Sequence, residues 1–146
     1  LSPRISIGHT SLNTRNMLKR RHYNIGDDYN CLLCDQQTEE DVEHIVFQCP
    51  FSKQCWSILG ITWQDSGSRL QWISHAATDW NKPMFMEIFL QAAWSIWKER
   101  NNKHFRNIAP TLLSWLERFK HDFSLLQTRT DKREFILAFI QNLEPP

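Results

Sequence analysis

Apolar side chains recur at helical spacing through most of the second half of the chain. Residues 83–106 are apolar on nearly every side before Lys98, which predicts a long helix at the centre of a bundle. Residues 69–79, residues 111–127 and the stripe from Phe135 to Leu143 each carry one apolar face. The pattern therefore predicts a mainly α protein built on a helical bundle of about four longer helices.

Prolines and capping residues set the expected helix ends. Pro83 suits the first turn of the long helix, where its missing N–H has no partner to lose. Thr111 is expected to cap the helix that follows. Asp131 and Glu134 have the spacing of a capping box, which places the start of the last helix beside them.

The same periodicity predicts which side chains are buried. Leu70, Ile73 and Ala77 share one face of the helix over 69–79, and Phe105 continues the apolar stripe of the long helix. We interpret the aromatic residues of the long helix as core. A nucleic-acid stacking platform is disfavoured, because stacking side chains must be exposed beside cations.

All four cysteines of the chain lie between residues 31 and 55. Cys31, Cys34, His44 and Cys49 form the pattern C-x2-C-x9-H-x4-C, in which two cysteines of a tight knuckle and two later residues can complete a tetrahedron around zinc. Four protein ligands would leave no open coordination position, so such a zinc is structural. Cys55 as a replacement for His44 or Cys49, and His22 as a remote candidate, stay open on spacing alone.

Two other interpretations of the cysteines are weaker. Cysteine is often buried as a small apolar residue, but such cysteines are scattered and these are concentrated. Disulfides are disfavoured because nothing resembles a secretory signal and a bond between Cys31 and Cys34 would close a very small loop.

Local signals favour His44 and Cys49 as the second ligand pair. Thr38 followed by Asp41 predicts a helix start, and the expected helix covers about 39–48. Pro50 is expected to stop that helix just after Cys49. The prediction is a hairpin knuckle that faces a short helix, and a further short helix over 52–59 follows.

Four sequence words resemble the zinc-binding domain at the C-terminal side of reverse transcriptases in LINE-type (non-long-terminal-repeat) retroelements, especially those of plants. They are TSLNTRNMLKRR at 10–21, CLLC at 31–34, TEEDVEHIVFQCPFSKQCW at 38–56 and AWSIWKERNNKHF at 93–105. The resemblance implies zinc ligands at Cys31, Cys34, His44 and Cys49, with Cys55 at a non-ligand position.

The resemblance also implies that the pattern Trp97-Lys98-x-Arg100-Asn101 is a signature of the family. We expect its arginine to be buried and tied to backbone. Glu99 and Lys103, within the same word, are spaced for an i,i+4 ion pair.

Length and composition predict one globular domain. The 146 residues are 41% hydrophobic and include seven tryptophans, which excludes a disordered chain. No charge-free apolar run is long enough for a membrane span. We predict a single domain over 1–146, with a zinc-binding module at 10–60 and a helical bundle at 69–144, and the loop 64–68 (QDSGS) lies between them.

Charge is distributed unevenly although the net charge is only +1. Residues 1–26 carry five cations and no acid, whereas residues 27–50 carry seven acids and no lysine or arginine. An acidic zinc module repels phosphate, so any nucleic-acid contact is expected from the basic segment. The candidate phosphate-binding residues are Arg15, Lys19, Arg20 and Arg21; the alternative is a solvated face that neutralises the zinc module.

Catalytic motifs are missing from the sequence: it has no glycine-rich phosphate loop and no nucleophile elbow. We therefore expect no enzyme and no small-molecule substrate.

The resemblance implies a non-catalytic zinc domain that assists RNA or DNA binding. The alternatives are a co-opted domain that binds a protein partner, and a module that packs against a polymerase. The expected location is intracellular, nuclear or cytoplasmic; the basic N-terminus also has the composition of a mitochondrial presequence.

Overall fold

The computed structural model describes residue 14 and residues 29–145 of the chain. In these residues the fold is helical, with an isolated antiparallel bridge between Asn30 and Glu39 and no strand. This confirms the predicted mainly α class with a cysteine–histidine cluster beside a bundle. The helices are, in order, η1 (His44–Gln48), α2 (Pro50–Ile58), α3 (Arg69–Asp79), α4 (Phe85–Arg106), α5 (Leu112–Ser124), η2 (Leu125–Thr128) and α6 (Arg133–Asn142).

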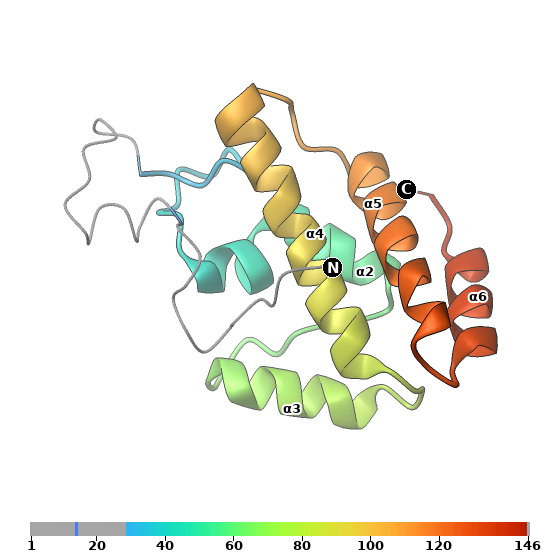
Figure 1. The fold of residues 1–146 in the computed structure, drawn as a ribbon. Helices are drawn as coiled ribbons and strands as arrows, with labels where there is room; N and C mark the ends of the chain where they lie inside the picture. The colour runs from blue at the N-terminus through green and yellow to red at the C-terminus, as the bar shows by residue number, and fades with distance from the viewer. Residues whose placement is uncertain (1–13, 15–28, 146) are drawn as a thin grey trace.

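The long helix α4 crosses the middle of the molecule, as its pattern predicts (Figure 1). It packs against α5, α2 and η1, and α6 packs on the far side of α5. Side chains such as Ile88, Ala92 and Ile96 are fully buried along it. A helix in contact with neighbours on several sides loses most of its polar face, which explains its nearly continuous apolar sequence.

The start of α4 differs from the prediction. Pro83 lies before the helix, and Met84 precedes the first turn in a left-handed conformation with φ 65°. The Pro83 carbonyl accepts a hydrogen bond from Trp80 Nε1 at 3.1 Å. This side-chain bond fixes the corner between α3 and α4. Pro83 is therefore part of the connection between the two helices and not of the first turn of α4.

Helix α3 has the predicted bounds but buries a different face. Trp72 and Ala76 are buried and Ile73 is half-buried, whereas Leu70 and Ala77 are exposed. The Trp72 ring packs edge-on to a core phenylalanine, and its Nε1 donates to the Ser66 carbonyl at 2.9 Å. A tryptophan buries more apolar area than a leucine, so it decided which side of the helix faces inward.

The C-terminal helices keep their predicted stripes. Thr111 Oγ1 accepts a hydrogen bond from Ser114 N at 3.0 Å and caps α5 as expected. The capping box predicted from Asp131 and Glu134 is wrong. Lys132 precedes α6 without a side-chain cap, and Asp131 Oδ1 is 3.5 Å from Thr130 Oγ1 instead. The last helix is therefore held by its buried apolar face and not by its cap.

One aromatic cluster joins the N-terminal half of the described chain to the bundle. Phe47 of η1, Trp56 of α2 and Trp63 all pack on Phe89 of α4, with ring centroids 5.4–6.1 Å apart. The buried apolar residues form one continuous core from Cys31 to Leu143. In the part of the chain that the structure describes, no helix is both long and apolar enough to cross a bilayer.

A capping box not foreseen from the sequence starts α3. Ser68 Oγ accepts from Gln71 N at 3.3 Å, and Gln71 Oε1 accepts from Ser68 N at 2.7 Å. We expect Ser68→Ala to lower stability by about 1 kcal/mol and the melting temperature by about 3 °C. Thermal denaturation followed by circular dichroism measures this. Ser74→Ala, at an exposed serine of the same helix, is the control and should leave the melting temperature nearly unchanged.

Candidate metal centre

A short antiparallel turn carries the first two cysteines. Cys31 N donates to the Thr38 carbonyl at 2.8 Å, and Glu40 N donates to the Tyr29 carbonyl at 2.9 Å. These bonds close a hairpin over the residues between them, and Gln37 makes its tight turn with φ 54°. The predicted hairpin knuckle is therefore present, and Cys31 and Cys34 lie on it.

The helical segment after the knuckle starts later than predicted. Asp41 Oδ1 accepts a hydrogen bond from His44 N at 2.7 Å, the bond that a helix N-cap makes. Thr38 and Glu39 belong to the hairpin instead, because their backbone groups are paired with the opposite arm. Asp41 therefore caps the turn that carries His44, and the expected cap at Thr38 is wrong.

A π-helical turn brings His44 and Cys49 together. Cys49 N donates to the His44 carbonyl at 2.6 Å, an i+5 bond, which ends η1. Pro50 offers no N–H and begins α2 at its first turn, so it both ends one helix and starts the next.

Two side chains of α2 replace the backbone donors that this junction lacks. The Ile45 carbonyl accepts from Ser52 Oγ, and the Val46 carbonyl accepts from Trp56 Nε1 at 2.6 Å. Buried carbonyls require such partners. The segment CPFSKQCW therefore accounts for the junction. Pro50 ends the helix, and Ser52 and Trp56 supply the hydrogen bonds that the backbone no longer makes.

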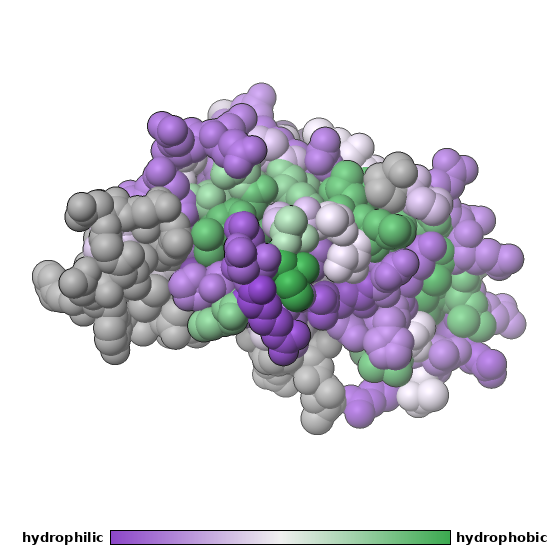
Figure 2. All heavy atoms as spheres, turned by 90° about the horizontal axis from the view of Figure 1, so that it is seen from above, coloured by the Kyte–Doolittle hydropathy of each residue, from purple (hydrophilic) through white to green (hydrophobic). Residues whose placement is uncertain are grey.

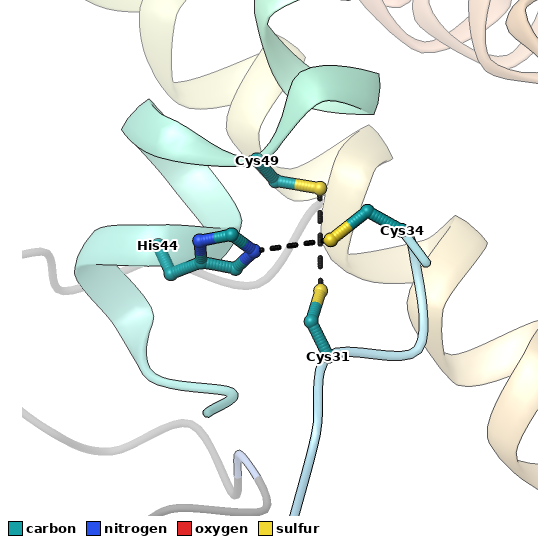
Figure 3. A group of neighbouring side chains, drawn as sticks. All are labelled: Cys31, Cys34, His44 and Cys49. Carbon is teal, nitrogen blue, oxygen red and sulfur yellow. Dashed lines mark hydrogen bonds between the residues drawn. The ribbon is translucent and has the colours of Figure 1, made fainter. Parts of the chain in front are cut away.

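The four predicted residues converge at one point (Figure 3). One potential ligand atom from each of Cys31, Cys34, His44 and Cys49 lies within 4.8 Å of all the others. Cys31 Sγ is 4.0 Å from Cys49 Sγ, and Cys34 Sγ is 3.4 Å from His44 Nε2. In a tetrahedral zinc site with ordinary bond lengths, two sulfurs lie about 3.8 Å apart and a sulfur and a nitrogen about 3.6 Å apart. The distances and the donor set fit one zinc ion.

The three cysteine thiols shift one another's pKa. The pKa of Cys49 is lowered to about 4, chiefly because the Cys31 thiol donates a hydrogen bond to its sulfur, with His44 adding to the effect. That shared proton raises the pKa of Cys31 well above its ordinary value. Burial raises the pKa of Cys34. A cation would replace these protons, because it stabilises all three thiolates together.

Cys55 lies outside the cluster. It is fully buried on α2, and burial, with the nearby Glu99 carboxylate adding to it, raises the pKa of its thiol. It is absent from the group of converging donors, as the resemblance implied. His22, the remote candidate, lies outside the described residues, as do Arg15, Lys19, Arg20 and Arg21.

A buried ion pair ties the knuckle to α4. Arg100 donates to Glu40 Oε1 from Nη2 at 2.7 Å and from Nε at 3.1 Å, and both side chains are at most 2% exposed. The other carboxylate oxygen of Glu40 accepts from Leu32 N, between the two knuckle cysteines, at 3.3 Å. Arg100 also stacks on the Trp97 ring at 4.8 Å. The expectation of a buried arginine is correct, but its partner is a carboxylate and not backbone.

Glu99 has partners other than the predicted one. Its buried carboxylate accepts from Thr111 N at 3.3 Å and from Ser114 Oγ at 3.2 Å, which holds the start of α5 against α4. Lys103 Nζ instead donates to Asn107 Oδ1 at 3.0 Å at the end of the helix. The i,i+4 pair predicted between Glu99 and Lys103 is therefore wrong, because Glu99 is used in the core.

Comparison with known families agrees with this geometry. Residues 5–56 match the family model described as zinc-binding in reverse transcriptase. The match covers this segment and not the rest of the chain. The match confirms the resemblance seen in the sequence, and it concerns a zinc-binding domain, with no catalytic domain found. A search of curated proteins gave no match. A search of solved structures gave none either.

The matched segment ends inside α2, so the Glu40–Arg100 pair joins it to a helix beyond the matched residues. We expect Arg100→Met to lower the free energy of unfolding by about 3–5 kcal/mol, because it leaves a buried carboxylate unpaired. Urea denaturation measures this. The double variant Glu40→Gln with Arg100→Met should lose less than the sum of the two single variants.

The exposed pair Arg69–Glu43, with 3.9 Å between Nε and Oε2, is the control. Arg69→Met should cost less than about 1 kcal/mol, since exposed pairs contribute little. Equal losses for Arg69→Met and Arg100→Met would contradict the special role of the buried pair.

Proposed function

We propose that Cys31, Cys34, His44 and Cys49 bind one structural Zn²⁺. The observation that carries this is the convergence of three sulfurs and one imidazole within 4.8 Å, in a segment of a zinc-binding family. The donor set completes a tetrahedron and offers no open position for substrate or water. When bound, the ion would supply a fixed link between the knuckle, η1 and the N-cap of α2, and no reaction chemistry.

The surrounding residues explain what such a link holds. The knuckle has few apolar side chains of its own, since Cys31 and Leu33 are its buried apolar residues among 31–38. Its position depends on the four ligands and on the Glu40 carboxylate. Without the metal, three closely spaced sulfurs would compete for protons, and the hairpin would lose its main attachment to η1.

Zinc removal is expected to unfold the N-terminal half of the protein. Cys34→Ser should abolish stoichiometric zinc and lower both helical content and melting temperature, because ligand binding is part of the folding free energy. Elemental analysis and circular dichroism measure both quantities. Cys31→Ser should behave in the same way.

Cys55→Ala is the matched control, a buried cysteine outside the cluster. It should keep about one zinc per chain and lose only the stability expected of a small core deletion, about 1 kcal/mol. Zinc lost from Cys55→Ala but kept in Cys34→Ser would overturn the ligand assignment.

We further propose that the zinc domain is non-catalytic and assists RNA or DNA binding, with Arg15, Lys19, Arg20 and Arg21 as phosphate contacts. The support is the family match, which includes these residues, and the charge pattern of the sequence. Residues 27–50 are acidic and repel phosphate, so the cationic residues 1–26 supply the attraction.

A second function has a structural observation in its favour. Several large apolar side chains on the bundle are at least 37% exposed, among them Met86, Leu90, Leu125 and Leu137. Large exposed apolar side chains are the kind of surface that a protein partner buries. A domain that binds a protein partner, with weak nucleic-acid affinity, is therefore the alternative.

Salt dependence separates the two functions. Fluorescence anisotropy with labelled single-stranded RNA and DNA should show an affinity that falls steeply with salt. Replacing Arg15, Lys19, Arg20 and Arg21 by glutamine should reduce the slope of log K against log salt by up to about 3, since each contact to single strands contributes about 0.7. Arg129→Gln with Lys132→Gln and Arg133→Gln, near the start of α6, is the control. No binding by the native protein at low salt would favour the protein-binding alternative.

A further inference from the structure

An aromatic and cationic stripe runs along the solvent side of α4. Trp94, Lys98, Asn101 and Phe105 follow one another at spacings of four, three and four residues, so they lie on one side of the helix. Trp94 is half-buried, and Phe105 is 73% exposed. Phe105 was expected in the core, and that expectation is wrong. One exposed ring, Phe105, and one ring partly buried against the core, Trp94, therefore lie on the same side of α4.

The core and the knuckle occupy other sides of the same helix. Ile96, Ala92 and Phe89 are buried on the side that faces the bundle. Arg100, which pairs with the acidic knuckle, precedes Phe105 by five residues, about 140° around the helix axis. The negative charge of the knuckle thus lies to one side of the stripe.

Cations accompany the aromatic rings. Lys98 Nζ lies 5.1 Å from the centre of the Trp94 ring. Lys103, His104 and Arg106 form the last turn, and the His104 ring packs edge-on to Phe105 with centroids 4.5 Å apart. Residues 100–116 contain no acid, and Glu99 is buried with partners from α5. In Figure 2, seen from above Figure 1, hydrophobic and hydrophilic atoms lie side by side on the face toward this end of α4.

We propose that the α4 stripe, formed by Trp94, Lys98, Asn101 and Phe105, binds single-stranded nucleic acid by base stacking. Exposed aromatic rings beside cations are the combination that such surfaces use, because every base has a face that stacks and every nucleotide has a phosphate. The two rings are about 16 Å apart along the axis, which is long enough for several nucleotides.

The amide of Asn101 lies between the two rings. Its oxygen accepts from Arg100 Nη1 at 3.1 Å, and this bond orients the side chain. The buried ion pair of Arg100 therefore also positions a residue of the stripe. The stripe lies beyond residues 5–56, so it is separate from the matched zinc-binding segment.

This inference rests on the proposed nucleic-acid function, and it assigns the α4 stripe as a binding surface for the nucleic acid. The test uses labelled oligouridine and oligothymidine, which form no duplex, and compares the native chain with Phe105→Ala. We expect Phe105→Ala to weaken binding about 5- to 100-fold while the salt slope is kept, because a stacking contact carries no charge. Lys98→Gln should reduce the slope by about 0.7.

Leu70→Ala is the matched control, since Leu70 is 75% exposed on α3, away from this end of α4. Its affinity should equal that of the native chain.

Oligonucleotides with 5-iodouracil should give photocrosslinks in the peptide that contains Trp94 or Phe105. Tighter binding of oligouridine would identify RNA as the ligand, and tighter binding of oligothymidine would identify DNA.

The outcomes distinguish the two proposals. Salt-dependent binding by the native chain that Phe105→Ala leaves unchanged would overturn the stripe and keep the nucleic-acid function. No binding by the native chain would overturn both. Unchanged nucleic-acid affinity together with loss of self-association in Phe105→Ala would overturn the stripe in favour of a contact between copies of the chain.

Discussion

The buried ion pair between Glu40 and Arg100 holds the hairpin against α4. Both groups are buried, and a buried charge without a partner is costly, so the two residues must meet whenever the chain is folded. Their meeting fixes the hairpin against one turn of α4 across 60 positions of sequence. A buried pair adds little to stability compared with an apolar pair of the same shape. We infer that its value is in fixing this register.

The same carboxylate reaches the metal knuckle. One oxygen of Glu40 holds Arg100, and the other accepts from the backbone between the two knuckle cysteines. The knuckle is thereby attached at two points: through Glu40 to α4, and through its sulfurs to His44 and Cys49. A hairpin with so little apolar surface needs both attachments, because its own burial cannot offset the conformational entropy lost when it orders.

Charge differs between the knuckle and the end of α4. The hairpin and η1 belong to an acidic stretch, whereas the end of α4 carries cations and an exposed aromatic ring. The acidic stretch repels phosphate, so the proposed nucleic-acid contacts lie outside it. In the proposed arrangement, zinc would hold the knuckle in place and nucleic acid would contact surfaces outside it.

Local spacings in the sequence predict the convergence of the three cysteines and His44, the helical class and most helix positions, because these features depend on residues close in sequence. Two cysteines two residues apart, a proline after Cys49 and apolar stripes are local patterns that dictate local geometry. Long-range packing sets which face α3 buries, which acid caps the turn before His44, and where Arg100 finds its partner. Periodicity predicts several apolar faces of similar hydrophobicity on one helix. Which of these faces is buried depends on the shape of the neighbouring surface. The pairing of Glu40 with Arg100 joins residues too distant for any spacing rule, since it follows from how the hairpin and α4 pack.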